Sequence, residues 1–167
     1  MGCNISLSKG SDSDTAKIVL LLGLDNSGKT TLLYRIKNDE FSDSVPTIGL
    51  NIEEVEKENF RMTLWDVSGK SKKLWKHYYD RVDGIIFVVD STDTDRISEV
   101  KRELESIILE ETLQTVPIMI LCNKTDISNG LKCLKTENDN FDIAPCSAKT
   151  GIGVWEGIEK LQKLFPS

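Results

Sequence analysis

The sequence predicts an α/β fold with a doubly wound, mostly parallel six-stranded sheet, helices on both faces and one antiparallel edge hairpin strand. Continuous blocks of Val, Ile and Leu recur along the chain, as expected for parallel strands buried on both faces. Helix-periodic segments alternate with these blocks, and a glycine-rich loop follows the first block. The 167 residues are enough for one such domain with a substantial core.

The first expected element is a flexible arm over residues 1–16, rich in serine, glycine and aspartate, with the folded domain over residues 17–167. Within the domain, buried strands are expected at "KIVLLLG", "GIIFVVD" and "VPIMILCNK". The stretch "LNIEEVEKENFRMTLWD" has period-two alternation around "KEN", which predicts the antiparallel hairpin. Two amphipathic helices are expected where apolar residues recur at helical spacing, namely Ile97, Val100, Leu104, Ile107 and Ile108, and then Val154, Ile158, Leu161 and Phe165.

Charge and cysteine content exclude several classes of function. The chain has 21 Lys and Arg against 27 Asp and Glu, a net charge of -6, so we expect no nucleic-acid partner. The four cysteines form no C-x-x-C pair, which argues against a zinc site, and Cys122 and Cys146 are expected to be buried. Neither a secretory signal nor an apolar stretch of membrane-spanning length is visible, so we expect a reducing, cytoplasmic location.

The stretch "GLDNSGKT" satisfies the phosphate-loop pattern G-x-x-x-x-G-K-[ST] between an expected strand and an expected helix. Glycines let successive backbone N–H groups point at a phosphate, and the helix N-terminus adds partial positive charge. A lysine here can reach the terminal phosphates, and a threonine hydroxyl can ligate Mg²⁺. The expected phosphate-binding residues are Gly23, Leu24, Asp25, Asn26, Ser27, Gly28, Lys29, Thr30 and Thr31.

A second motif, "NKTD", follows the strand block "IMILC" and indicates which base is bound. The carboxylate of Asp126 can accept hydrogen bonds from N1–H and the exocyclic amine of guanine, whereas adenine presents an acceptor at N1. "SAK" follows a later strand-like run and could offer a backbone N–H to the guanine oxygen. The expected base-binding residues are Asn123, Lys124, Asp126, Ser147, Ala148 and Lys149.

Several strings together, "GLDNSGKTTLLYR", "VPTIGLNIEEVE", "LWDVSGK", "LWKHYY", "FVVDSTD" and "NKTD", resemble the ADP-ribosylation factor (Arf-like) family of small GTPases over nearly the whole chain. The resemblance implies GTP and GDP as ligands with Mg²⁺ as cofactor. Thr47 matches the switch threonine that joins the Mg²⁺ shell when the γ-phosphate is present. Asp66 matches the residue that holds Mg²⁺ through water, and Gly69 the residue whose N–H contacts the γ-phosphate. Breaking these contacts would release both segments, an order–disorder switch.

The resemblance also implies an effector surface at Leu50, Trp65 and Tyr78, although these side chains could equally be core. The first of them is usually phenylalanine in the family. The family reads W-D-x-G-G-Q, whereas this chain reads "WDVSGK", so Lys70 stands where the water-orienting glutamine should be. Lysine has three donors and no acceptor, so it cannot orient water as an amide does. The residues assigned to catalysis are Thr47, Gly69 and Lys70. Because of Lys70, we expect intrinsic GTP hydrolysis to be weak.

The N-terminal arm begins "MGCNIS", which satisfies the myristoylation pattern M-G-x-x-x-[ST] at Gly2. One myristoyl chain gives only marginal membrane binding, and the arm has few apolar residues and no basic cluster. We therefore expect S-palmitoylation of Cys3 as a second anchor. We therefore expect a peripheral location on the cytosolic face of a membrane, with the Golgi, endosomal and plasma membranes as candidates.

The expected function is a monomeric, membrane-associated GTP/GDP switch in trafficking or signalling, whose partners are an exchange factor, effectors and an activating protein. One alternative is a GTP-bound adaptor without turnover, which a hydrolysis assay distinguishes. Another is a P-loop kinase or ATPase, which would need an acceptor-binding lid and extra catalytic arginines; no segment of the sequence suggests either.

Overall fold

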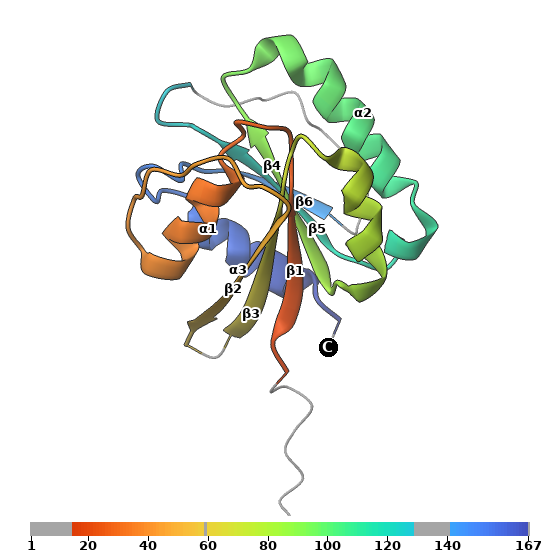
Figure 1. Cartoon of the computed structure of the whole chain (residues 1–167). Helices are drawn as coiled ribbons and strands as arrows, with labels where there is room; N and C mark the ends of the chain where they lie inside the picture. The colour runs from red at the N-terminus through yellow and green to blue at the C-terminus, as the bar shows by residue number, and fades with distance from the viewer. Residues whose placement is uncertain (1–14, 59, 129–140, 167) are drawn as a thin grey trace, which may run out of the picture.

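The computed structural model describes residues 15–58, 60–128 and 141–166 (Figure 1). In this part of the chain, six strands form one sheet in the order β2-β3-β1-β4-β5-β6. Their bounds are β1 (Lys17–Leu22), β2 (Leu50–Lys57), β3 (Phe60–Val67), β4 (Gly84–Asp90), β5 (Ile118–Asn123) and β6 (Phe141–Pro145). β2 and β3 pair antiparallel, and every other pair of neighbours is parallel. The predicted fold class is confirmed.

The burial of the strands follows from their apolar blocks, and the register of the hairpin agrees with the predicted turn. All six residues of β5 and the first six of β4 are buried, because helices cover both faces of these central strands. At the edge, β2 alternates between polar and apolar residues and is mostly exposed or half-buried. Leu50 lies opposite Val67 and Lys57 opposite Phe60, so the hairpin turns at the predicted stretch.

The helices form a layer on each face of the sheet (Figure 1). α1 (Lys29–Asn38) and α3 (Val154–Leu164) pack on one face, where Leu32, Ile36 and Ile158 join the core. On the other face lie a 3₁₀ helix, η1 (Lys72–Arg81), and α2 (Ile97–Ile108), with the short 3₁₀ turns η2 (Thr94–Arg96) and η3 (Glu111–Leu113) at the two ends of α2. The two predicted amphipathic helices correspond to α2 and α3.

The carboxyl ends of the parallel strands lie along one edge of the sheet, where ligands bind in folds of this class. β1 leads into the glycine-rich loop, β3 into residues 68–71, β5 into Lys124 and β6 into Cys146. Motifs far apart in the sequence therefore arrive at the same edge.

Cys122 and Cys146 are buried, as predicted. Burial raises the pKa of the Cys146 thiol to about 12, so this thiol stays protonated and unreactive near neutral pH. The predicted lipidation sites Gly2 and Cys3 lie outside the described residues, as does all of the expected arm except its last two positions. None of the helices in the described ranges has the length and apolar character to cross a bilayer.

Candidate functional site

The glycine-rich loop leaves β1 at Gly23 and enters α1 at Lys29. Its last glycine, Gly28, has φ +94°, and a Cβ there would lie 2.3 Å from Asn123 Nδ2. A side chain at this position would therefore clash as well as strain the backbone. The Gly28 carbonyl accepts a hydrogen bond from Leu32 N at 2.8 Å, which begins the helix. The loop thus presents a helix N-terminus, whose first N–H groups have no partner within the helix.

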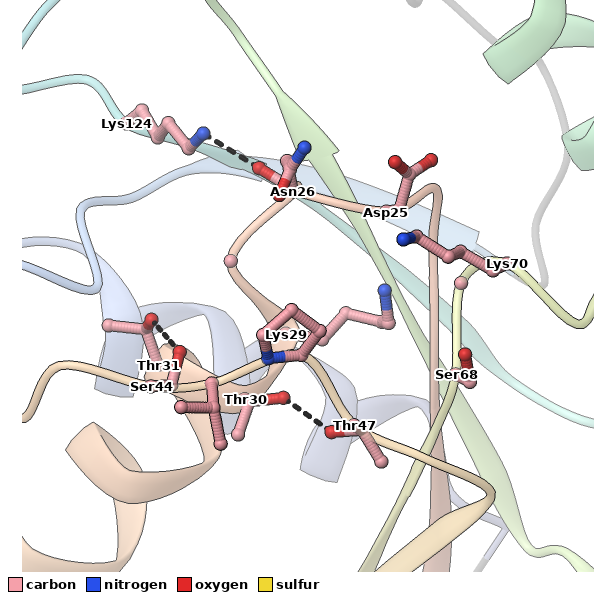
Figure 2. A pocket seen from close by; sticks show the side chains of 14 residues that line it. Asp25, Asn26, Lys29, Thr30, Thr31, Ser44, Thr47, Ser68, Lys70 and Lys124 are labelled. Carbon is pink, nitrogen blue, oxygen red and sulfur yellow. Dashed lines mark hydrogen bonds between the residues drawn. The ribbon is translucent and has the colours of Figure 1, made fainter.

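A cavity of about 440 Å³ opens beside this loop (Figure 2). Of the predicted phosphate-loop residues, those that line it are Asp25, Asn26, Gly28, Lys29, Thr30 and Thr31. Other predicted residues that line it are Thr47, Gly69, Lys70 and Lys124, and residues that were not predicted are Ser44, Val45, Pro46 and Ser68. Gly23, Leu24 and Ser27 do not line the cavity; the Leu24 side chain belongs to the core. The structure therefore brings four separate stretches of the chain around one space: residues 25–31, 44–47 and 68–70, and Lys124.

Lys29 is almost completely buried, with 7% of its surface exposed. Its Nζ donates hydrogen bonds to the carbonyl oxygens of Gly23 and Leu24, both at 3.0 Å. Burial lowers the pKa of Lys29, and the carboxylates of Asp66 and Asp25 oppose that shift. An ammonium has three N–H donors, so one remains for a ligand in the cavity.

Thr30, Thr47 and Asp66, the three predicted metal-binding residues, lie in direct contact. Asp66 Oδ2 accepts from Thr30 Oγ1 at 2.6 Å and from Thr47 Oγ1 at 2.8 Å. The two hydroxyl oxygens lie 2.8 Å apart (Figure 2). These residues come from α1, from the segment before β2 and from β3, so the contact joins three elements.

The donor set of this cluster fits Mg²⁺. Asp66 is fully buried, and its Oδ1 has no hydrogen-bond partner among the described residues. A buried carboxylate oxygen without a donor is costly, and a metal ion or its bound water would satisfy it. The described residues contain no group of three or more His, Cys, Asp or Glu that could hold a metal by themselves. Mg²⁺ suits such a site because it is commonly held by one or two carboxylates, waters and ligand phosphates.

Residues after β3 pack against the phosphate loop. A Cβ on Gly69 would lie 2.5 Å from Asp25 N and 2.7 Å from Gly23 O, so glycine is required by close approach of two backbones. Lys70 follows, is exposed and lines the cavity. Figure 2 shows its ammonium directed toward Asp25. Lys70 therefore lies at the cavity, close to the phosphate loop.

Arg96, on η2, is a contact residue that sequence reasoning missed. Its Nη1 donates to Asp25 Oδ1 at 2.8 Å, and its Nη2 donates to the Asp25 carbonyl at 2.9 Å. Its Nε donates to Asp93 Oδ2 at 2.6 Å, which holds the guanidinium from the other side. The hydrogen bond from Arg96 holds the pKa of Asp25 below its usual value, against the opposing effect of burial. The phosphate loop is thus fastened to the start of α2.

The predicted base-binding residues Asn123 and Lys124 support the phosphate loop from the side of β5. Asn123 Nδ2 donates to the Ser27 carbonyl at 2.9 Å. Lys124 Nζ donates to the Asn26 carbonyl at 2.7 Å and to Asp90 Oδ2 at 2.6 Å. Burial works to raise the pKa of Asp90, but the hydrogen bond from Lys124 and those from Thr92 outweigh it and lower the pKa.

Asp126, Ser147 and Ala148 join the same network. Ser147 Oγ donates to Asp126 Oδ1 at 2.7 Å, and the Ala148 N–H donates to Asn123 Oδ1 at 2.9 Å. The Ala148 N–H is therefore used within the protein, so a ligand oxygen would share it or take another N–H of this loop. Of the predicted base-binding residues, Lys124 alone lines the 440 Å³ cavity. Asn123 ends β5, and the others lie in the loops that follow β5 and β6.

Arg35 on α1 is a second residue that the sequence did not single out. It is buried, and its Nε donates to the Ala148 carbonyl at 2.9 Å. Its Nη2 donates to the Lys149 carbonyl. Arg35 therefore fixes the "SAK" loop relative to the phosphate-loop helix.

The predicted effector residues are half-buried rather than fully core. Trp65 and Tyr78 stack edge to face, with ring centroids 5.8 Å apart, and pack with Leu50 against the core of this face. Ile52, directly opposite Trp65 on β2, is 49% exposed, and Ile48 just before β2 is 97% exposed. Apolar side chains thus continue from the core onto the surface beside the cavity.

The chain is similar to known proteins over most of its length. A family model described as the ADP-ribosylation factor family matches residues 5–165. ADP-ribosylation factors J and K of Dictyostelium discoideum are each 39% identical to it over 152 residues, covering 84% of this chain and 81% of theirs. Among solved structures, the Arl6 (BBS3) small GTPase of Trypanosoma brucei, with a bound nucleotide analogue, GppNp, matches with a TM-score of 0.78 and 32% identity. That match covers 89% of this chain and 96% of the other.

The matched region includes the phosphate loop, the two segments beside it and the base-binding motifs. The fold agrees as well, because the solved relative superposes over most of both chains. The chain belongs to the ADP-ribosylation factor family of small GTPases.

Proposed function

We propose that this protein is a membrane-associated GTP-binding switch that holds guanine nucleotide and Mg²⁺ in the cavity beside the phosphate loop. The observation that carries the proposal is the cluster of Thr30, Thr47 and Asp66, whose buried Asp66 Oδ1 has no partner among the described residues. Family membership supports it, since the Trypanosoma brucei relative was solved with a nucleotide analogue bound.

The residues have distinct roles in this proposal. The loop from Gly23 to Thr31 would hold the phosphates through backbone N–H groups, with Lys29 donating its remaining N–H. Thr30 and Thr47 would offer hydroxyl oxygens to Mg²⁺, and Asp66 would hold it through a water molecule. When bound, the ion neutralises phosphate charge.

Base selection would come from Asp126, whose Oδ1 already accepts from Ser147. A carboxylate can accept from two neighbouring donors, which guanine has and adenine lacks. Asn123, Ser147, Ala148 and Lys149 would shape the rest of this wall, with Lys124 between it and the phosphate loop.

The switch would operate through two segments that meet the cavity. Thr47 belongs to the segment before β2 and Gly69 to the segment after β3, and the β2–β3 hairpin joins them. Loss of the terminal phosphate would remove contacts from both segments at once, so an effector that reads them distinguishes GTP from GDP. Leu50, Trp65 and Tyr78 would form part of that effector surface.

Intrinsic hydrolysis is expected to be weak because Lys70 has no acceptor for the attacking water. Small GTPases with an intact water-orienting glutamine hydrolyse GTP at roughly 10⁻⁴ per second without a partner. We expect this chain to be slower in a single-turnover assay, and Lys70→Gln to be faster than both the parent and Lys70→Met. Equal rates for the three proteins would contradict a role for the missing amide, and a complete absence of turnover even with cell extract would favour a GTP-bound adaptor.

Nucleotide binding is tested with fluorescent GDP, GTP, XTP and ATP in the presence of Mg²⁺. We expect tight guanine binding that Asp126→Asn weakens by about a hundredfold or more while improving xanthine binding, because the amide can donate to the xanthine C2 carbonyl. Asp142→Asn removes a half-buried carboxylate of β6 that pairs with Lys160, away from the cavity, and should not alter nucleotide binding. A preference for ATP would refute the proposal and favour a P-loop kinase or ATPase.

Membrane attachment is proposed from Gly2 and Cys3, which lie outside the described residues, and from family membership. One acyl chain binds marginally, so two anchors are needed for stable residence. We expect Gly2→Ala and Cys3→Ser each to move the protein from membrane to soluble fractions of cells. Retention of both variants on membranes would contradict dual acylation. An exchange factor, effectors and an activating protein are the proposed partners.

A further inference from the structure

Lys70 is expected to weaken hydrolysis, but that expectation does not explain why its side chain lies at the cavity. Its backbone is anchored, because the preceding Gly69 packs directly on the phosphate-loop backbone at Asp25 N and Gly23 O. Its side chain is exposed and lines the cavity. The long, flexible Lys70 side chain therefore extends from an anchored backbone, with its ammonium toward Asp25 (Figure 2).

Asp25 is already engaged by another cation. Arg96 donates to its carboxylate at 2.8 Å and to its carbonyl at 2.9 Å, and Asp93 holds Arg96 in turn. Lys70 interacts with the Asp25 carboxylate only through space, without a hydrogen bond. Arg96 alone can therefore keep Asp25 paired when Lys70 turns away.

The other two lysines that line the cavity are held in place. Lys29 Nζ donates to two carbonyls of its own loop, and Lys124 Nζ donates to the Asn26 carbonyl and to Asp90. Of the three lining lysines, Lys70 is the one whose ammonium forms no hydrogen bond with a residue that the structure describes. All three of its N–H donors are available to a ligand.

We propose that Lys70 is a specificity-determining residue that recognises the terminal phosphate and so favours GTP over GDP. The inference rests on the proposed function, because it assigns a part of the same nucleotide site. In the triphosphate-bound protein the ammonium turns from Asp25 to the γ-phosphate oxygens. In the diphosphate-bound protein it has no such acceptor and stays near Asp25.

Donor chemistry supports this assignment. Charge-assisted hydrogen bonds between an ammonium and a phosphate are stronger than those between neutral groups, and a triphosphate carries more negative charge at this end than a diphosphate. Solvent screens an exposed lysine, which limits the gain. We expect about a tenfold contribution to the ratio of GTP to GDP affinity, or about 1.4 kcal/mol. Lysine in place of the family's glutamine at position 70 would then weaken hydrolysis and also prolong the GTP-bound state.

The test measures dissociation constants for GDP and for GTPγS, which resists hydrolysis, with Mg²⁺ present. We expect Lys70→Met to lower the preference for GTPγS over GDP about tenfold while changing GDP affinity less than twofold. Lys70→Arg keeps the charge and donors and should retain most of the preference. Lys73→Met is the matched control, because Lys73 is an exposed lysine of η1 that does not line the cavity.

Two outcomes overturn the inference. An unchanged ratio in Lys70→Met would show that Lys70 does not reach the terminal phosphate. An equal loss of GDP and GTPγS affinity would show that Lys70 only supports the loop. Failure of the parent protein to bind either nucleotide would instead refute the proposed function, so the two failures are distinguishable.

Discussion

Asp25 is the residue at which the phosphate loop, η2 and the segment after β3 meet. Arg96 donates two hydrogen bonds to it, one to the carboxylate and one to the carbonyl, whereas Lys70 acts on it only through space. The Arg96 guanidinium therefore holds both the backbone and the side chain of Asp25 in place. A lysine could not replace Arg96 here, because only the planar fork reaches both oxygens together.

The Arg96–Asp25 pair leads to a prediction on pH. Arg96 lowers the pKa of Asp25 in the folded protein below its ordinary value of 3.8, so the pair stabilises the fold above that value. The contribution is lost as pH falls through the lowered pKa, where the carboxylate protonates. In a double-mutant cycle with Arg96→Met and Asp25→Asn, we expect a coupling energy of about 1 kcal/mol at neutral pH, because both side chains are partly exposed to solvent.

This coupling is measured by chemical denaturation between pH 7 and pH 3. The exposed pair of Arg81 and Asp80, whose charged atoms are 4.0 Å apart, is the control and should show no measurable coupling. A coupling between Arg96 and Asp25 that stayed constant down to the lowest pH would show that it is not electrostatic.

At the scale of elements, the main feature is how β3 and its following segment reach the loop after β1. The two strands pair in parallel, with Leu21 beside Asp66, so both chains leave the sheet at the same edge. Gly69 then lies against the loop with no room for a Cβ. This close contact makes the segment after β3 sensitive to the shape of the phosphate loop.

Substitution of Gly69 by alanine tests that contact. The new Cβ would lie 2.5 Å from Asp25 N and 2.6 Å from Leu24 C, and both are backbone atoms that cannot rotate away. We expect nucleotide release to accelerate about tenfold or more, and the free energy of unfolding to fall by about 1–3 kcal/mol. Fluorescent nucleotide release and denaturant titration measure the two effects. Lys73→Ala, an exposed change on η1, should alter neither, and parent-like release from Gly69→Ala would contradict the expectation.

At the scale of the whole molecule, the site is shared between several elements. Its walls come from loops at the carboxyl edge of the sheet and from the first turn of α1, and a core on each face supports the sheet. A ligand that contacts all these loops binds the folded chain and not the unfolded one. Binding should therefore stabilise the entire domain rather than one segment.

We expect GTP with Mg²⁺, at about one hundred times the dissociation constant, to raise the free energy of unfolding by about 2.7 kcal/mol. For a chain of this size that corresponds to a rise of about 5–10 °C in Tm. Chelation of Mg²⁺ should remove part of the rise, because the Asp66 and Thr47 oxygens then lose their shared ligand. Thermal unfolding followed by circular dichroism measures it. An equal rise with ATP and Mg²⁺ would contradict guanine selection.

Much of this molecule follows from local sequence. Apolar blocks and helical periodicity predicted the six-stranded sheet, its hairpin and helices α2 and α3. Burial of one or both faces of an element fixes the spacing of apolar residues within it, and that spacing is visible in a short stretch of sequence. The phosphate-loop and "NKTD" motifs were visible for the same reason: each is a short run whose spacing reflects one turn. Family membership followed from these strings and was confirmed.

The tertiary structure alone decided which distant side chains meet. Arg96 reaches Asp25 across 71 positions, and Arg35 reaches the Ala148 carbonyl across 113, so no local pattern marks either contact. The contact of Thr30 with Asp66 and Thr47 likewise depends on how three elements pack, and so does the lack of a partner for Asp66 Oδ1 among the described residues. The sequence by itself determined the elements and motifs, because the spacing of apolar residues and the residue types in turns are local properties. The charged contacts around the cavity were decided only by the tertiary structure, because folding brings distant loops together at one edge of the sheet.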